Sequence, residues 1–304
     1  MVDHGAQNRE IMKFDRLTLG TVQFGMDYGI ANTKGRLSKD EAHKLLLCAQ
    51  ERGVRTLDTA ASYGDSEKCL GEIGIRAWEV VSKIPGLPSV TSKTEAYSWF
   101  DNSIQRSLKR LKINTLHGLL IHRPSDLLGP YGQTLYTLLS DTKKRGMAKK
   151  IGISVYSPSE LEVLFDRYPI DMVQLPLNVF DQRFAESGWL TRLKQAGVEI
   201  HSRSVFLQGL LLMPADARPK QFFEWPDVWR RWDQWLQDTR ISPLVACLNA
   251  ALMREEIDRV VIGFDNLKQF EQLCETRLDP RISLPTFSDC VEEALINPSK
   301  WSAP

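Results

Sequence analysis

The chain has 304 residues, of which 42% are hydrophobic and 25% are charged, a composition typical of globular proteins that excludes a disordered or fibrous chain. Its 39 basic and 38 acidic residues leave a net charge of +1. This argues against a nucleic-acid partner, because phosphate contacts require an excess of cations. The five cysteines are widely spread without a C-x-x-C pair, which argues against a disulfide framework or a metal site and favours a cytoplasmic location.

The chain begins with a polar extension, residues 1–14, whose sequence MVDHGAQNREIMKF has no apolar segment of the kind found in signal peptides. No later segment approaches 18 consecutive apolar residues. We therefore expect neither a membrane span nor a membrane partner.

After this extension, short runs rich in Val, Ile and Leu alternate with longer amphipathic stretches, a pattern that indicates repeated βα units around a parallel sheet. The expected strands are Leu17–Val22, Val54–Leu57, Glu79–Ser82, Gly118–Ile121, Lys150–Ile153, Met172–Leu175, Val198–His201 and Val260–Ile262. Eight such units without a linker predict a single α/β domain over residues 1–304, a (βα)8 TIM barrel. The alternative is an open, doubly wound sheet, but no G-x-G-x-x-G follows the first strand.

The stretches between the strands carry helix signals. Ser38 and Glu41 form a potential capping box before an apolar run that ends at Gly53. A second helix is expected over Tyr97–Leu111. Residues 210–240 form an insertion after the seventh strand with a tryptophan-rich helix, which would lie on the same face of the barrel as an active site.

Four polar residues stand at or near the ends of three consecutive strands: Asp58 and Tyr63 after the second, Lys83 at the third and His122 at the fourth. Each residue alone is commonly structural, since an Asp caps loops, a Tyr packs and a Lys is solvated. Together, at the carboxyl ends of strands where barrel enzymes place their catalytic groups, they predict an active site.

With these residues the chain resembles the aldo-keto reductase superfamily. The resemblance runs from LTLGTVQFG at the first strand to VVIGFDNLKQFEQ at the eighth, and Asp58, Tyr63, Lys83 and His122 match the family's catalytic tetrad in type and order. It implies a (βα)8 barrel that reduces the carbonyl group of an aldehyde or ketone with a nicotinamide cofactor and without a metal.

The chemistry accounts for the four residue types. Hydride transfer to a carbonyl carbon develops negative charge on the oxygen, so a proton donor is needed beside it. Tyr63 is the expected general acid, and we expect Lys83 to lower its pKa through its positive charge. Asp58 would keep Lys83 charged, and His122 can donate a hydrogen bond to the substrate oxygen.

The resemblance also implies a set of cofactor contacts at the remaining strand ends. Ser154 and Gln174 would hold the nicotinamide carboxamide, although Val155 stands where the family commonly has Asn, and simple loop capping is the alternative. Arg203 replaces an aromatic ring that often stacks on nicotinamide. The complete expected set is Thr21, Ser154, Gln174, Arg203, Ser204, Phe206, Gln208, Gly209, Gly263, Asp265, Gln269 and Gln272.

The family favours NADP(H), but the segment after the eighth strand weakens that preference and leaves NAD(H) open. Asp265 stands near the position where relatives carry a basic or hydroxyl residue for the 2′-phosphate, and it would repel that group. Lys268 would offset the repulsion if it pointed inward, and the alternative is that Asp265 only caps the next helix.

The substrate is a small carbonyl compound, and the opening GTVQFGMDYGIAN resembles a branch associated with sugar metabolism. Its far end is expected to meet Met26, Tyr28, Arg123 and Asn178. An alternative function is a nicotinamide-nucleotide sensor or scaffold with little turnover, but a pure binder has no need of Tyr63 beside Lys83. The oligomeric state stays open, and many relatives act as monomers.

Overall fold

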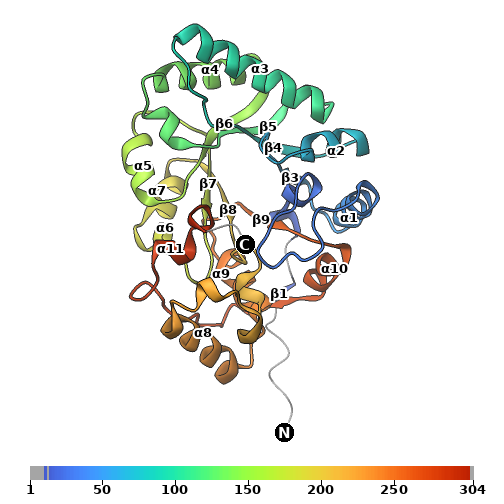
Figure 1. Cartoon of the computed structure of the whole chain (residues 1–304), viewed down its shortest axis with the longest axis vertical. Helices are drawn as coiled ribbons and strands as arrows, with labels where there is room; N and C mark the ends of the chain where they lie inside the picture. Colours follow the sequence, from blue (N-terminus) through green and yellow to red (C-terminus); the bar gives the residue numbers. More distant parts are fainter. Residues whose placement is uncertain (1–9, 12–13, 302–304) are drawn as a thin grey trace.

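The computed structural model describes residues 10–11 and 14–301. In this part of the chain, eight parallel strands form a closed barrel in which neighbours follow chain order and the last strand pairs with the first (Figure 1). They are β2 (Leu17–Gly20), β3 (Thr56–Asp58), β4 (Glu79–Ile84), β5 (Leu116–Ile121), β6 (Ala148–Ser154), β7 (Met172–Pro176), β8 (Glu199–Arg203) and β9 (Arg259–Gly263). The prediction of a single-domain (βα)8 barrel is confirmed.

Helices surround the barrel and cover the outer face of the strands (Figure 1). Strands that are buried on both faces are nearly continuous apolar runs, as β7 illustrates, where all five residues are buried. The helices are α1 (Lys39–Glu51), α2 (Ser66–Ile73), α3 (Lys93–Leu111), α4 (Gly132–Lys144), α5 (Pro158–Leu164), α6 (Arg183–Glu186), α7 (Trp189–Gln195), α8 (Pro226–Thr239), α9 (Pro243–Leu252), α10 (Leu267–Glu275) and α11 (Glu293–Ile296). None of those in the described ranges is both long and apolar enough to cross a membrane.

Local signals in the sequence account for several helix boundaries. Ser38 and Glu41 form the expected capping box at the start of α1, and Gly53 lies just beyond its end with a left-handed φ of 91°. The helix expected from Tyr97 begins four residues earlier, because Ser92 accepts a hydrogen bond from the Glu95 amide and acts as its N-cap. Such boundaries depend on one side chain rather than on periodicity.

Most of the extension expected at residues 1–14 lies outside the described residues, which omit 1–9 and 12–13. Residues 10–11 form β1 (Glu10–Ile11), which pairs antiparallel with β10 (Arg277–Leu278), the strand after α10. This short two-stranded sheet is separate from the barrel.

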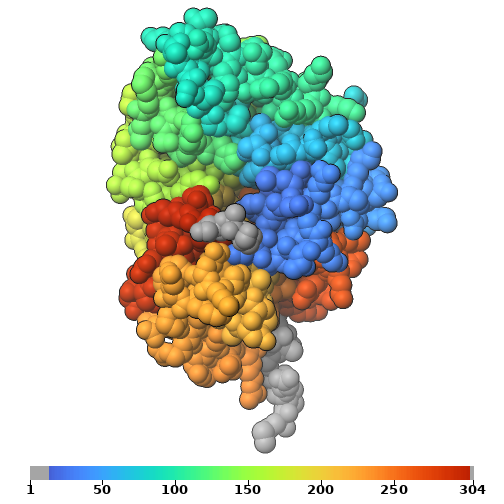
Figure 2. Space-filling view, viewed as in Figure 1, coloured from blue at the N-terminus to red at the C-terminus, as the bar shows by residue number. Residues whose placement is uncertain are grey.

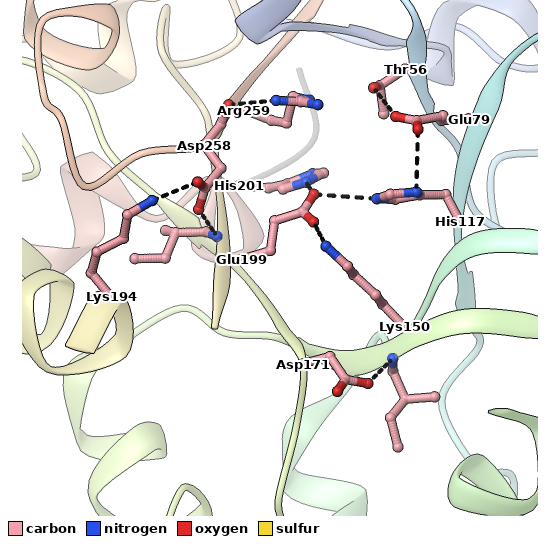
Figure 3. Close-up of polar contacts among 12 residues, drawn as sticks. Thr56, Glu79, His117, Lys150, Asp171, Lys194, Glu199, His201, Asp258 and Arg259 are labelled. Atoms are coloured by element: carbon pink, nitrogen blue, oxygen red, sulfur yellow. Dashed lines mark hydrogen bonds and ion pairs between the residues drawn. The ribbon is translucent and has the colours of Figure 1, made fainter. Parts of the chain in front are cut away.

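A polar network occupies the amino-terminal end of the barrel (Figure 3). Its centre is Glu199, the first residue of β8, whose carboxylate contacts Lys150 and lies 2.6 Å from His201 Nε2 and 3.4 Å from His117 Nε2. These partners come from β6, β8 and β5, so one carboxylate ties three strands together. Because this network lies at the opposite end of the strands from the four candidate catalytic residues, it belongs to the stability of the barrel.

The insertion at residues 210–240 follows β8 and consists of three short 3-10 helices, Leu210–Leu212, Ala215–Ala217 and Lys220–Phe222, followed by α8. Trp229 and Trp232 of α8 are buried and pack against Phe180, with ring centroids 5.2 and 5.9 Å away. Arg218 pairs with Asp233 and lies over the Trp229 ring. The two tryptophans therefore pack this segment against the barrel.

Candidate active site

The strand register brings the four predicted catalytic residues to one end of the barrel. Asp58 is the last residue of β3, Lys83 is the penultimate residue of β4, and His122 follows directly after β5. Tyr63 lies in the turn between β3 and α2, where its amide donates to the Ala60 carbonyl at 3.0 Å. Parallel strands in register present their carboxyl ends together, so the four residues converge although they span 64 positions, from 58 to 122.

Asp58 and Lys83 form a buried ion pair. The Lys83 Nζ atom donates to both carboxylate oxygens of Asp58, at 2.8 and 2.7 Å, and to the Thr59 carbonyl at 3.0 Å. Only 1% of the Lys83 side chain and 5% of the Asp58 side chain is exposed. A buried ammonium needs such a partner, and three acceptors fix its position.

Tyr63 and His122 lie next to this pair. The Tyr63 hydroxyl is 3.5 Å from Lys83 Nζ, and the His122 ring meets the Tyr63 ring edge-on with centroids 5.9 Å apart. The His122 Nδ1 atom is 3.2 Å from the Ser62 hydroxyl. A phenol, an ammonium, a carboxylate and an imidazole are thus assembled within hydrogen-bonding or van der Waals reach of one another.

The electrostatics keep the phenol and the imidazole neutral. Burial raises the pKa of Tyr63 above its ordinary value, and the Asp58 carboxylate adds to the shift. The expected net lowering of the Tyr63 pKa is not found, because burial and the Asp58 carboxylate outweigh the positive charge nearby. Burial, with the charges of Lys83 and Arg203 nearby, lowers the pKa of His122 to about 3. Burial also lowers the pKa of Lys83, while Asp58 opposes that shift.

A cavity of about 640 Å³ opens beside the four residues, a size that suits a cofactor or small-molecule ligand. Asp58, Tyr63 and His122 line it, and Lys83 lies behind Asp58. The residues expected to hold a cofactor share this wall, and every one of them lines it: Thr21, Ser154, Gln174, Arg203, Ser204, Phe206, Gln208, Gly209, Gly263, Asp265, Gln269 and Gln272.

The segment after β8 bridges one side of the cavity. Three non-glycine residues in it, Ser204, Leu207 and Gln208, have left-handed φ values of 62°, 48° and 55°, which L-residues adopt at a cost. Gln208 accepts from the Ala31 amide at 3.3 Å and donates from Nε2 to the Tyr28 hydroxyl at 3.2 Å. The connection after β2 and the connection after β8 therefore touch at the cavity. In Figure 2 the blue amino-terminal part of the chain lies beside the gold-to-orange surface of its last third.

Arg203, at the end of β8, adopts a fixed position in the cavity wall. Its guanidinium lies 4.2 Å from the centre of the Tyr156 ring and donates to the Val155 carbonyl at 3.0 Å and the Ser204 hydroxyl at 3.3 Å. Tyr156 also lines the cavity and was not expected from the sequence. Its position two residues after Ser154, just past the end of β6, was the available signal.

Among the four residues expected to meet substrate, the structure brings only Tyr28 into the cavity wall. Asn178 is buried and accepts from the Phe180 and Asp181 amides, so it shapes a turn. Arg123 pairs with Asp126 and packs over Gly86, and Met26 is exposed outside the lining. All four residues lie near strand ends, but this position does not show which of them line the cavity. The direction of each side chain decides whether it can contact a ligand there.

Fold and site together define a (βα)8-barrel protein with an acid–base cluster at the carboxyl ends of its strands. The chain belongs to the aldo/keto reductase family, whose model matches residues 16–280.

Three curated relatives are 26 to 31% identical to this chain over the parts that align. A 6-dehydroglucose reductase from Novosphingobium aromaticivorans is 26% identical over 61% of this chain and 65% of its own length. An aldo-keto reductase from Gibberella moniliformis is 28% identical over 69% of this chain and 68% of its own length. A 2,5-diketo-D-gluconic acid reductase B from Corynebacterium is 31% identical over 45% and 48%. The chain thus spans less than two thirds of the first and third of these relatives.

Solved structures share the fold. An aldo-keto reductase from Bacillus halodurans, in its holo form, superposes with a TM-score of 0.67 at 16% identity, covering 94% of this chain and 95% of its own. A glycerol dehydrogenase from Gluconobacter oxydans gives 0.66 at 20% identity, with 97% of both chains covered.

Proposed function

We propose that this protein reduces the carbonyl group of an aldehyde or ketone, with NADH or NADPH as the reductant and Tyr63 as the general acid. The observation that carries the proposal is the meeting of Tyr63 and His122 with the buried Asp58–Lys83 pair at the wall of one cavity. Family membership supports an oxidoreductase that acts on carbonyl groups.

The residues of the cavity fit a nicotinamide cofactor. Gln174 is buried, and its Oε1 atom has no partner within the described residues, which leaves an acceptor for a carboxamide N–H. Ser154 lies on the neighbouring strand in register with Gln174, and Thr21 lines the same wall. When bound, the cofactor supplies the hydride, and these side chains would orient its nicotinamide end.

Each member of the cluster has a distinct task. Tyr63 is held neutral by burial, so it has a proton to give to the carbonyl oxygen as negative charge develops there. Lys83, 3.5 Å from the phenol oxygen, stabilises the phenolate left behind, and Asp58 holds Lys83 in place. His122, as a neutral imidazole, can donate a second hydrogen bond to the substrate oxygen. The same groups run the reverse reaction with an alcohol.

We further propose that the substrate is sugar-like. Two relatives carry the names of sugar-derivative reductases, 6-dehydroglucose reductase and 2,5-diketo-D-gluconic acid reductase B. Around the cavity, Tyr28, Tyr156 and Gln208 present hydroxyl and amide groups that suit a polyhydroxylated molecule.

The test is loss of reduced-cofactor absorbance in the presence of a panel of aldehydes, ketoses and aldoses. Tyr63→Phe is expected to lower kcat about 100-fold or more while cofactor affinity is retained, because one proton donor is removed and the ring is kept. Tyr97→Phe, which removes the same hydroxyl from the exposed face of α3, is the matched control. Tight cofactor binding without turnover of any substrate would instead favour the nucleotide-sensor alternative.

A further inference from the structure

The connection between β9 and α10 carries a cluster of hydrogen-bond acceptors in the cavity wall. Asp265 is its centre: the Oδ1 atom accepts from Gln23 Nε2 at 3.3 Å and the Oδ2 atom accepts from Gln269 Nε2 at 3.2 Å. All three residues line the cavity. Asp265 does not cap α10, because Asn266 is the N-cap and accepts from the Gln269 amide at 3.0 Å.

Gln23 adds a second acceptor whose identity the contacts fix. A carboxylate only accepts, so the Gln23 atom that faces Asp265 is the amide nitrogen and the other atom is the oxygen. Gln23 is 7% exposed, and its Oε1 atom is buried without a partner. A Cβ on Gly263 would lie 2.7 Å from Oε1, so the glycine keeps this atom clear of a side chain. A buried acceptor left unpaired is costly, which points to a ligand that donates.

The same wall is poor in cations. Within the described residues, Arg203 is the only lysine or arginine that lines the cavity, and it is held by Val155 and Tyr156. Lys268, which could have offset Asp265, is exposed and does not line the cavity. Asp58 is neutralised by Lys83, but no lysine or arginine among the described residues pairs with Asp265.

We infer that Asp265 and Gln23 bind the hydroxyls of the cofactor's adenosine ribose and reject a 2′-phosphate, so that the protein uses NAD(H) in preference to NADP(H). The inference rests on the proposed function. It places the nicotinamide beside Tyr63 and the rest of the dinucleotide along the cavity, which reaches past β2 to the β9–α10 connection. Two neighbouring ribose hydroxyls can donate, one to the carboxylate and one to the unpaired oxygen, whereas a phosphate offers only acceptors and negative charge. This reverses the preference for NADP(H) that the family resemblance implies.

The experiment measures binding rather than turnover. Calorimetric titrations compare NADH with NADPH, and ADP-ribose with its 2′-phosphate, because the second pair lacks nicotinamide and isolates the adenosine end. Wild type is expected to bind NADH and ADP-ribose about tenfold tighter than their 2′-phosphorylated counterparts, or more. Asp265→Asn should reduce this ratio of affinities at least threefold. Gln23→Met should weaken the binding of ADP-ribose but not the binding of its 2′-phosphate.

Glu271→Gln is the matched control, because it removes the same charge from an exposed position on α10 outside the cavity. Its ratio should equal that of wild type. Tighter binding of NADPH by wild type overturns the inference, as does a ratio that Asp265→Asn leaves within twofold of the wild-type value. If both nucleotides bind equally and both support carbonyl reduction, only the selectivity is wrong. If neither nucleotide binds, the proposed function fails with it.

Discussion

Gln174 donates from Nε2 to Asp58 Oδ1 at 2.7 Å, the same carboxylate oxygen that accepts from Lys83 at 2.8 Å. The residue expected to hold the nicotinamide is therefore hydrogen-bonded to the Asp58–Lys83 ion pair. Because its nitrogen is committed to Asp58, only Gln174 Oε1 remains for a ligand. A rotation of this amide would place two acceptors against each other, so the ion pair sets which end of Gln174 meets the cofactor.

This link predicts the effect of Gln174→Met, which keeps the length of the side chain and removes both polar atoms. The Kd for NADH should rise about five- to tenfold with the loss of one hydrogen bond, and the free energy of unfolding should fall by about 1 to 3 kcal/mol. Titration calorimetry and urea unfolding measure the two effects. Ser202→Ala removes a buried polar atom from the adjacent strand outside the cavity and should leave the Kd unchanged. An unchanged Kd in Gln174→Met would remove Gln174 from the cofactor site.

A second prediction separates the structural and catalytic roles of Lys83. Lys83→Met leaves the Asp58 carboxylate buried and unpaired, so we expect it to lower the free energy of unfolding by about 3 to 5 kcal/mol. Adding Asp58→Asn removes the second charge and should restore most of that stability. Urea unfolding measures this recovery. In the double variant kcat should stay low, since no cation is left to stabilise the phenolate of Tyr63. Recovery of wild-type kcat together with stability would show that Lys83 serves the fold alone.

A third prediction concerns acid stability. Hydrogen bonds from His117, His201 and Lys150 lower the pKa of Glu199 below the ordinary value of 4.5, although burial opposes them. A group whose pKa is lower in the folded state stabilises the protein above its unfolded pKa, and this contribution is lost as pH falls below about 4.5. Glu199→Gln should therefore destabilise the protein by roughly 2 kcal/mol at neutral pH and flatten the acid limb of the stability profile.

Urea unfolding between about pH 2.5 and 7 measures this profile, because the contribution of Glu199 is lost below the unfolded pKa of about 4.5. Glu79→Gln is the control, because that carboxylate is 40% exposed and its contacts are longer, at 3.3 Å to the Thr56 hydroxyl and 3.7 Å to His117 Nδ1. It should change stability by less than about 1 kcal/mol. Both variants should keep wild-type kcat, since the network lies at the amino-terminal end of the strands. An equally steep acid limb in Glu199→Gln would contradict the assignment.

The sequence predicted all eight barrel strands to within a few residues, because strands buried on both faces leave uninterrupted apolar runs. It also indicated four residues that the structure brings together, since Asp58, Lys83 and His122 interrupt those runs where a strand ends and Tyr63 follows nearby. The sequence did not predict the direction in which the side chains point. Asn178 follows β7 closely, yet it turns inward to bind backbone amides, and Arg123 turns away to Asp126.

The balance of charges around Tyr63 also could not be predicted from the sequence. The sequence shows a lysine that should lower the pKa of Tyr63, but only the structure shows that the phenol is buried and that the lysine is paired with Asp58. Gln23 passed unnoticed because an amide in a loop gives no sequence signal. Its importance depends on a neighbour more than 200 positions away, Asp265.

The pairing of β2 with β9 joins residues 17–20 to residues 260–263, and Gln23 and Asp265 extend this junction into the cavity. During synthesis, β3, β4 and β5 leave the ribosome long before β9. The strands that carry Asp58, Lys83 and His122 therefore precede the strand that leads to Asp265. The residues of the acid–base cluster are therefore synthesised before the Gln23–Asp265 contact can form. A nucleotide that binds only the closed barrel would stabilise it against unfolding, so the proposed cofactor would favour the fully closed state.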